Sequence, residues 1–529
     1  MIQNPILRGF HPDASVCKVG KDIYIATSTF EWWPGVEIYH TKDLINFELV
    51  AQPLNRISQL SMTGNRNSGG IWAPHLSYAD GKFWLAFTDV KTCTKYKDTL
   101  NYIITCDKID GEWSEPIFIN ASGFDPALFH DEDGKKYFIN MLFDHREDHP
   151  SFSGVIIQEY DPLKRKLIGK RKLFYEGTSL GVCEGPQIFK KDGYYYLVCA
   201  AGGTGYAHAS TVARSRKIMG EYENSPYFPL ITTKSQPENL LQKAGHASFV
   251  EIDGEWYITH ICSRPLTKRG NAVLGRETAL QKIIWVDGWP KLENGTIYPD
   301  LYVPKPKNFK NVLQNIDNSS YCNFSEENLP SYFKCLRKPL GDKISLSKRK
   351  GWLRLYGEQS LSSLHSQTLI ARRWQSFNFT AETAFEFNPQ NFQQMAGLVC
   401  FYNTENWMYA CATYDEEKAC RILKIECADL NNFSEPLGID VVNIPDKVNL
   451  IYLRVEVNRE KLQFYYSFGN KKFEKLGDVL PADHLSDDYI EKSGLVFTGA
   501  FVGICCQDLD RHTAYADFKY FNYIENKTE

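Results

Sequence analysis

Three acidic residues occupy matching places in a repeated, largely apolar sequence pattern. Asp13 lies in HPDASVC, Asp125 in FDPALFH and Glu184 in CEGPQIF, each among residues typical of a buried strand. A buried carboxylate without a partner is costly to ionise and tends to keep its proton. A turn or a sheet edge would explain any one of them alone, but three at one repeated position indicate a chemical purpose.

Grouped carboxylates have two common uses. They bind a hard cation such as Ca²⁺, which prefers oxygen ligands, or they serve as the acid and base that cleave a glycosidic bond. His246 and Arg276 are poor calcium ligands, so the second use is favoured and neither a metal nor a cofactor is expected. A third acid beside the first two has a defined role, because it raises the pKa of one member and keeps it protonated.

The elements that position these acids are read from a repeat of about sixty residues. A turn followed by an aromatic-rich strand recurs five times, with intervals of 61, 53, 59 and 61 residues between the turn glycines. Each copy predicts a tight hairpin. The turn glycines are Gly20, Gly81, Gly134, Gly193 and Gly254.

A second phrase precedes each turn at a nearly constant offset. Trp72, Asp125 and Glu184 lie nine residues before their turn glycine, His246 eight and Asp13 seven. About four strands per repeat, five times over, predict an all-β five-bladed propeller, in which these five positions converge on the central axis. An array of β-sandwiches is the alternative, but it does not explain the fixed register.

The repeat ends near residue 305, and a region of different character follows. We expect a propeller over 1–305, a proline- and asparagine-rich linker over 306–324, and a second domain over 325–529. Segments of the second domain alternate polar and apolar residues, as in an antiparallel β-sandwich.

Composition narrows the possible partners. The 529 residues carry 60 basic and 64 acidic side chains, a formal net charge of -4, so no basic excess suggests a nucleic-acid partner. Aromatic residues make up 14% of the chain, which suits sugar binding but also follows from the preference of β-sheets for such residues. A small, uncharged oligosaccharide is the expected ligand.

The location is predicted from features that the sequence lacks. The start MIQNPILRGFHPD does not resemble a signal peptide, and no apolar run approaches the roughly 18 residues of a membrane span. The 14 cysteines contain no CxxC pair and lie mostly in apolar runs. Buried free thiols indicate a reducing compartment, so we expect a cytoplasmic protein without a membrane partner.

Several long motifs resemble the family-43 glycoside hydrolases, in the branch of β-xylosidases and α-L-arabinofuranosidases. The matching phrases include NPILRGFHPDAS, GGIWAPHLSY, LQKAGHASFV and LGRETALQ, and ARRWQSFNF and FTGAFVG extend the resemblance into the second half. The resemblance implies a five-bladed propeller and a C-terminal concanavalin-like sandwich that closes the active site. It also implies an inverting exo-glycosidase that releases terminal xylose or arabinofuranose, acting as a homodimer or homotetramer.

The resemblance assigns a role to each acid. Asp13 would be the general base that activates water, Glu184 the general acid, and Asp125 the residue that tunes and holds Glu184. Arg276 and His246 would bind the terminal sugar, although Arg276 has the alternative of a surface ion pair with Glu277 and His246 that of a core histidine. The remaining expected sugar contacts are Phe30, Trp72, Phe124 and, from the sandwich, Phe501.

Three departures from the family pattern leave the substrate open. The chain reads EGPQ, with Gln187, where the family usually has EGPH, and AAGGT over residues 200–204 where the family usually has AEGGT. The stretch TKRGNAVL between RPL and GRET is also short. Preference for α-L-arabinofuranosides is therefore one alternative, and a non-catalytic sugar-binding propeller is another. The intact acids Asp13, Asp125 and Glu184 count against the latter.

Overall fold

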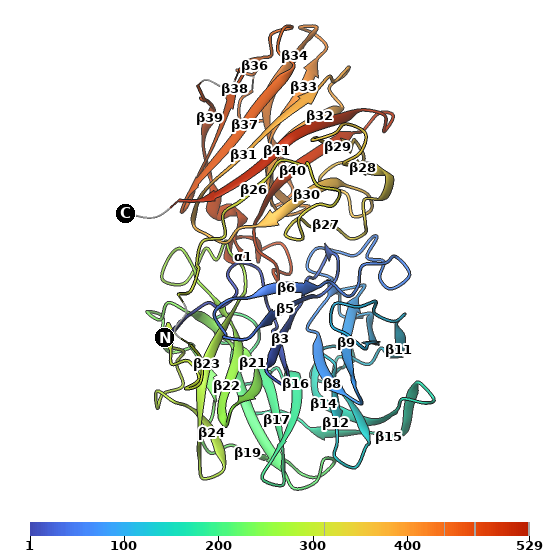
Figure 1. Ribbon diagram of the computed structural model, residues 1–529, viewed down its shortest axis with the longest axis vertical. Coiled ribbons are helices and arrows are strands. Elements are labelled where there is room, and N and C mark those ends of the chain that lie inside the picture. The colour runs from blue at the N-terminus through green and yellow to red at the C-terminus, as the bar shows by residue number, and fades with distance from the viewer. Residues whose placement is uncertain (311–312, 439, 470–471, 527–529) are drawn as a thin grey trace. The chain divides into compact units, whose positions relative to one another are not determined.

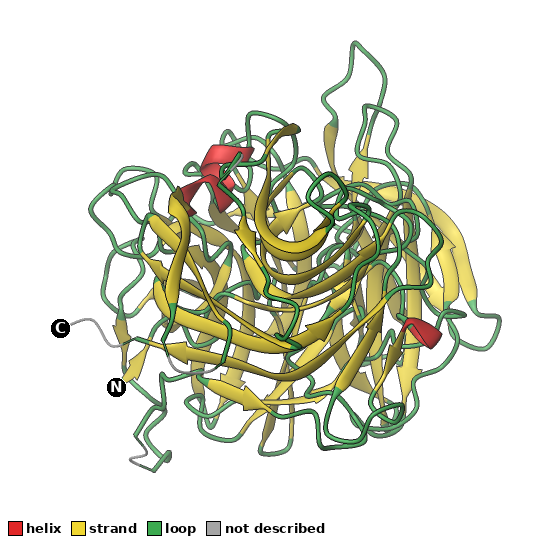
Figure 2. Cartoon of the chain, turned by 90° about the horizontal axis from the view of Figure 1, so that it is seen from above, coloured by secondary structure: helices red, strands yellow, loops and turns green. Residues whose placement is uncertain are grey.

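Strands and loops make up nearly all of the chain in the computed structural model, which describes residues 1–310, 313–438, 440–469 and 472–526 (Figures 1 and 2). Helical structure in those residues is limited to the 3₁₀ turns Gly341–Lys343 and Ala482–Leu485 and the one-turn helix α1, Asp487–Ile490. The all-β class predicted from the sequence is confirmed. None of the described helices is long and apolar enough to cross a membrane.

The chain divides into two compact units. The first comprises Met1–Arg264 and Arg276–Asn315, and the second Pro265–Gly275 and Ile316–Glu529.

Five antiparallel sheets make up most of the described part of the first unit, and each contains four strands that follow one another in the sequence. Two of these sheets have a fifth, two-residue strand, β7 (Gly70–Ile71) beside β9 and β20 (Ile231–Thr232) beside β18, and β1 (Ile2–Gln3) pairs with β25 (Tyr302–Val303) in a separate small sheet. The five sheets are the blades of the predicted five-bladed propeller, which is confirmed. The strands are β2 (Ser15–Val19), β3 (Asp22–Thr27), β5 (Glu37–Thr41) and β6 (Glu48–Ala51) in blade 1; β8 (His75–Ala79), β9 (Lys82–Val90), β10 (Thr99–Cys106) and β11 (Ile117–Asn120) in blade 2; β12 (Ala127–His130), β13 (Lys136–Phe143), β14 (Phe152–Asp161) and β15 (Lys166–Tyr175) in blade 3; β16 (Glu184–Lys191), β17 (Tyr194–Ala201), β18 (Ala209–Ser215) and β19 (Glu223–Asn224) in blade 4; and β21 (Gln242–Ile252), β22 (Glu255–Ser263), β23 (Glu277–Val286) and β24 (Trp289–Leu292) in blade 5.

The tight turns explain why the repeat is so regular. Each turn glycine joins the first two strands of its blade and has a positive φ, from 62° at Gly20 to 86° at Gly134. Glycine adopts this left-handed conformation without steric cost, and such turns match the twist of antiparallel strands.

The first strands of the blades contact one another in order around the axis, as the labels β8, β12, β16 and β21 in Figure 1 allow the reader to follow. The chain before blade 1 completes the ring, because Leu7 pairs with Thr278 of β23 and the His11 N–H donates to the Arg276 carbonyl at 2.9 Å. This closure brings the two ends of the propeller sequence together, beside Asp13.

The second unit is a sandwich of two antiparallel sheets. One sheet contains β28 (Ile344–Ser345), β29 (Leu353–Tyr356), β41 (Tyr515–Glu525), β31 (Asn378–Phe387), β37 (Leu450–Asn458), β38 (Lys461–Ser467) and β39 (Glu474–Pro481), with β26 (Ser320–Cys322) beside β41. The other contains β30 (Thr368–Arg373), β40 (Phe501–Asp508), β32 (Gln394–Asn403), β33 (Asn406–Asp415), β34 (Cys420–Asp429) and β35 (Asn432–Ser434), with β36 (Val442–Asn443) beside β34.

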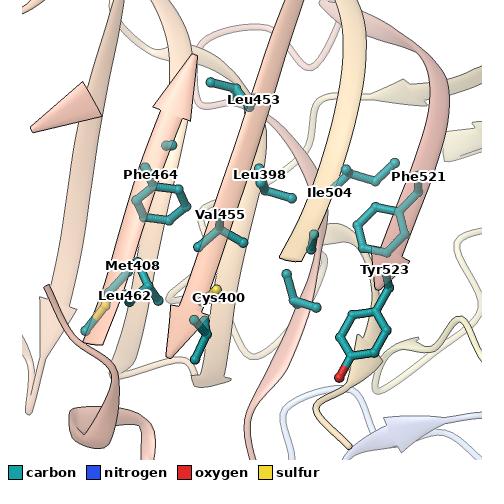
Figure 3. Close-up of a cluster of buried hydrophobic side chains, with 14 of the residues drawn as sticks. Leu398, Cys400, Met408, Leu453, Val455, Leu462, Phe464, Ile504, Phe521 and Tyr523 are labelled. Atoms are coloured by element: carbon teal, nitrogen blue, oxygen red, sulfur yellow. The ribbon is translucent and has the colours of Figure 1, made fainter. Parts of the chain in front are cut away.

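Side chains from both sheets interdigitate in the sandwich core (Figure 3). Leu398 and Ile504 come from one sheet, and Val455 and Phe464 from the other, and all four are fully buried. Buried and partly exposed residues alternate toward the end of β37, whereas β32 and β40 are buried along their whole length.

The loop between β22 and β23 does not belong to the unit expected from the sequence, which placed residues 1–305 in one continuous domain. Residues 265–275 group with the second unit, because Leu266 and Val273 belong to its core and the Ala500 N–H donates to the Val273 carbonyl at 2.9 Å. Residues 320–322, expected in the linker, form β26 of the sandwich. A sequence read in order does not reveal that a loop of one domain packs into the core of another.

Candidate active site

The three predicted acids lie at the starts of first strands in three blades. Asp13 precedes β2, Asp125 precedes β12, and Glu184 opens β16. Their residual exposures are 4, 7 and 8%, respectively. Asp13 and Asp125 adopt left-handed backbone conformations with φ of 57° and 54°, and His246 does the same at 55°. Such conformations are strained in residues other than glycine and concentrate at functional sites.

Asp13 accepts two hydrogen bonds from buried donors. The Arg276 guanidinium donates to one carboxylate oxygen at 3.2 Å, and the Ser28 hydroxyl donates to the other at 2.5 Å. The His246 Nδ1 atom lies 3.4 Å from the oxygen that Arg276 contacts. Hydrogen bonds of this kind fix the orientation of a carboxylate.

The alternative of a surface ion pair between Arg276 and Glu277 is wrong. Arg276 is 3% exposed, and Glu277 instead accepts two hydrogen bonds from Arg264, at 2.7 and 2.8 Å. The Arg276 guanidinium also lies 5.1 Å from the centre of the Phe30 ring, a cation–π contact.

Glu184 and Asp125 form a pair of buried acids. Burial and the charge of Asp13 raise the pKa of Glu184 to about 7. Burial, and then the charge of Glu184, raise the pKa of Asp125 as well, although the Gly185 N–H donates to the Asp125 carboxylate at 2.9 Å and opposes that rise. Since two buried anions repel each other, the pair retains a proton close to neutral pH.

The hydrogen bond from Gly185 distinguishes Asp125 from Glu184. A backbone N–H stabilises the charged form of the acid that accepts it, which is Asp125. This bond offsets part of the rise in the pKa of Asp125 that burial and the charge of Glu184 cause.

His246 is buried and packs against the chain that follows Glu184. Burial lowers its pKa, and Arg276 acts in the same direction, so the imidazole is neutral near pH 7. A Cβ added to Gly185 would lie 2.8 Å from the His246 Nε2 atom. Only a glycine therefore allows this close approach of the two blades.

Three of the predicted aromatic residues form a continuous wall. The Phe30 and Trp72 ring centres are 6.3 Å apart, and Trp72 contacts Phe124 edge-on at 4.9 Å. The Trp72 indole N–H donates to the Ser68 carbonyl at 2.9 Å, which fixes the orientation of the ring. A rigid wall of this kind suits the apolar C–H face of a sugar ring.

The sequence analysis missed Ser28. The hairpin of blade 1 pairs Ser15 with Ala26, and the same register continued outward places Ser28 opposite Asp13. The Ser28 N–H indeed donates to the Pro12 carbonyl at 3.2 Å. The turn at Gly20 therefore contained the signal needed to find it.

Phe501 opens β40 in the sandwich, where it is fully buried and pairs with Arg373 and Phe401. Its expected position over the active site stays a prediction. Within the described residues, no three or more His, Cys, Asp and Glu side chains are grouped in a way that could hold a metal ion.

Comparison with known proteins identifies the family. Residues 2–290 match the model of glycosyl hydrolases family 43, and residues 322–524 match that of the β-xylosidase C-terminal concanavalin A-like domain. The chain belongs to glycosyl hydrolases family 43. The resemblance seen in the sequence motifs is thereby confirmed, and the protein is a glycoside hydrolase.

Family-43 relatives resemble the chain over its whole length. A β-xylosidase of Bacillus subtilis is 49% identical, with 99% of each chain covered. Xylosidase/arabinosidase 43B of Humicola insolens is 45% identical over 99% of this chain and 97% of its own. The crystal structure of a xylan β-1,4-xylosidase from Bacillus halodurans superimposes with a TM-score of 0.95 at 46% identity, covering 99% of this chain and 100% of that one.

Proposed function

We propose that this glycoside hydrolase is an inverting exo-glycosidase that releases terminal β-D-xylose from xylo-oligosaccharides. The observation that carries the proposal is the contrast between two acids. Asp13 accepts hydrogen bonds from Arg276 and Ser28, whereas the pKa of Glu184 is raised to about 7. One group is set to accept a proton and the other to donate one.

In the proposed reaction, the Asp13 carboxylate takes a proton from a water molecule. The water oxygen attacks the anomeric carbon, and the bond from that carbon to the glycosidic oxygen breaks. Glu184 gives its proton to the departing oxygen, while Asp125 holds Glu184 in place and favours its protonated form. Attack from the face opposite the leaving group gives a product of inverted configuration.

The sugar contacts follow from the same geometry. The wall of Phe30, Trp72 and Phe124 would stack against the terminal pentose, and the buried polar atoms of Arg276 and His246 would bind its hydroxyl groups. Phe501 is the proposed contact from the sandwich.

Release of terminal α-L-arabinofuranose is the second candidate activity. The Humicola insolens relative is named xylosidase/arabinosidase, and a Vibrio relative that is 42% identical is named xylan 1,3-β-xylosidase. These names support a pentose-specific site, while they differ in the second sugar and in the linkage.

The proposal also includes a cytoplasmic location and assembly into a homodimer or homotetramer. All 14 cysteines are free, and eleven of them are buried. Buried thiols of this kind support a cytoplasmic location, because disulfides are rare there. A homodimer or homotetramer is checked by size-exclusion chromatography with light scattering.

The decisive assay compares nitrophenyl β-D-xyloside with nitrophenyl α-L-arabinofuranoside, followed by β-1,4- and β-1,3-xylobiose. We expect the highest kcat/KM within each substrate type on the β-D-xylosides and on the 1,4-linked disaccharide. Proton NMR of the first sugar formed should show the α anomer of xylose. A β anomer would contradict inversion, and no turnover of any of the four substrates would contradict the activity itself.

A further inference from the structure

One buried hydroxyl group connects the three strands that carry Asp13, Glu184 and His246. The Ser248 Oγ atom accepts a hydrogen bond from the Val16 N–H at 3.1 Å and donates one to the Gln187 Oε1 atom at 2.7 Å. Ser248 is 1% exposed, so water does not compete with these bonds.

The three linked residues stand at similar offsets from the site. Val16 lies three residues after Asp13 on β2, and Gln187 lies three residues after Glu184 on β16. Ser248 lies two residues after His246 on β21. A chain of two hydrogen bonds thus runs from the strand of the base, through the strand of His246, to the strand of the acid.

Strand pairing within blades 4 and 5 is irregular next to Glu184 and His246. The β16–β17 register shifts between Glu184 and Gln187, and the β21–β22 register shifts between Gly245 and Ser248. Glu184 and His246 therefore lie beyond an irregularity in pairing, whereas Gln187 and Ser248 lie at its edge, where regular pairing resumes. A tie between Gln187 and Ser248 acts at the last regularly paired residue before each site residue.

The segment of the acid is also tied on its other side. The Gly185 N–H donates to Asp125 of blade 3, and Gln187 accepts from Ser248 of blade 5. With both ties, the residues that follow Glu184 are held from two neighbouring blades, so that the backbone of Glu184 has little freedom to shift along the axis.

We propose that Ser248 is a positioning residue, which sets the separation of Asp13 and Glu184 by joining their strands, with Gln187 as its partner. The proposal rests on the roles given above to those two acids. An inverting site needs a base and an acid far enough apart to admit a water molecule, and a misplacement of about 1 Å costs about 10²-fold in rate. In this proposal, Gln187 helps to position Glu184 and does not contact the sugar.

Three variants test this role. Ser248→Ala removes both hydrogen bonds, and Gln187→Leu removes only the one to the strand of the acid, with little change in side-chain volume. Ser77→Ala is the matched control, because the Ser77 hydroxyl lies 3.0 Å from the His130 Nε2 atom and joins blades 2 and 3, which carry neither Asp13 nor Glu184.

We expect Ser248→Ala to lower kcat by about 10²-fold on both nitrophenyl xyloside and xylobiose, with KM nearly unchanged. Gln187→Leu should lower kcat on xylobiose at least about fivefold more than on nitrophenyl xyloside, because a good leaving group needs little help from an acid. The double variant should be no slower than Ser248→Ala alone. Ser77→Ala loses one hydrogen bond at a half-buried site, so it should lower Tm by less and keep the kcat of the unaltered enzyme.

The proposal is overturned if Ser248→Ala keeps its kcat within about threefold of the unaltered enzyme while its Tm falls, since about 10²-fold is expected from misplacement. Losses that multiply in the double variant would also overturn it.

Crystal structures of the unaltered enzyme and of Gln187→Leu measure the position of the Glu184 carboxyl group directly, without a substrate or a Ser248 variant. A Glu184 carboxyl group that moves by about 1 Å supports the tie, and an unmoved one refutes it. If the unaltered enzyme cleaves none of the four glycosides, the proposed function fails, and the crystal structures still decide the role of Ser248.

Discussion

The site contains three acids of similar chemistry, and their immediate contacts separate their tasks. Asp13 accepts hydrogen bonds from an arginine and a serine, and Asp125 accepts one from a backbone amide. Glu184 is buried beside the charge of Asp13, and its pKa is raised to about 7. These differences arise from neighbours and burial, not from the acids themselves.

Removal of the proposed acid should depend on the leaving group. Glu184→Ala should lower kcat/KM on xylobiose by about 10²- to 10⁴-fold, because an alkoxide leaves poorly without a proton. Nitrophenyl xyloside should lose much less, since nitrophenolate is stable as an anion. Steady-state kinetics on both substrates measure the difference, and equal losses would count against the assignment.

The raised pKa of Glu184 also predicts how activity and stability depend on pH. Activity should fall as the pH rises through about 7, because Glu184 loses the proton that it must donate. The folded enzyme holds this proton more tightly than the unfolded chain, whose ordinary value is 4.5. Stability from this group is therefore complete below about pH 4.5 and is lost as the pH rises to about 7.

Glu184→Gln carries no such proton and isolates this effect. The Tm of the variant minus that of the unaltered enzyme should increase between about pH 4.5 and 7 and then level off. Thermal unfolding followed by circular dichroism across that range measures the change. A difference that does not vary with pH would contradict the raised pKa.

At the scale of elements, the site residues lie at or near the start of the first strand of each blade, where regular strand pairing begins. Asp13, Asp125 and His246 take positive φ values, and in blade 4 the following Gly185 does so, with φ of 57°. This left-handed kink places the side chains where straight strands would not. It recurs in four blades, although the site residues lie seven to nine positions before their turn glycines.

Gly185→Ala tests this close fit between blades 4 and 5. The new Cβ would lie 2.8 Å from the His246 ring, and a positive φ costs a non-glycine residue about 1–2 kcal/mol. We expect a loss of about 10²-fold in kcat/KM because Glu184 and His246 are displaced.

Gly134→Ala provides the control for backbone strain. Its φ is 86°, but a Cβ there meets nothing within 4 Å. The control should lower Tm and keep kcat/KM, and a similar loss of activity in both variants would show that strain alone is responsible.

At the scale of the whole molecule, the sandwich is built as a domain with its own core. Its strands bury residues such as Phe464 and Ile504 between two sheets, and the loop 265–275 adds Leu266 and Val273 to that core. That loop continues directly into Arg276, which binds Asp13. The chain therefore passes between the two units on either side of this loop as well as after Asn315.

Phe501→Ala tests the proposed contribution of the sandwich to catalysis. If Phe501 contacts the sugar, the kcat/KM of the folded variant should fall by at least about tenfold. Such a truncation also lowers the free energy of unfolding by roughly 3–5 kcal/mol. Ile504→Ala is the control on the same strand, because Ile504 is fully buried and belongs to the core of the sandwich. It should lose about 2–5 kcal/mol of stability and keep its kcat/KM. Equal kinetics of the two variants would remove Phe501 from the site.

Much of the architecture was predictable because its signals are local. The five turn glycines and the alternation of the strands lie within short windows, and they led to the blade number and to the sandwich. The three acids stood out because a repeat makes equivalent positions visible. The place of loop 265–275 was not predictable, because packing into a distant core leaves no periodic trace in the loop itself.

The sequence by itself determined the propeller, the shared position of Asp13, Asp125 and Glu184, and the family. Only the tertiary structure decided which groups contact these acids. Arg276 and Asp13 are 263 positions apart, Gly185 and Asp125 are 60 apart, and Val16 and Ser248 are 232 apart. Such contacts form only when separate blades come together, and the burial that results raises the pKa of Glu184 and of Asp125.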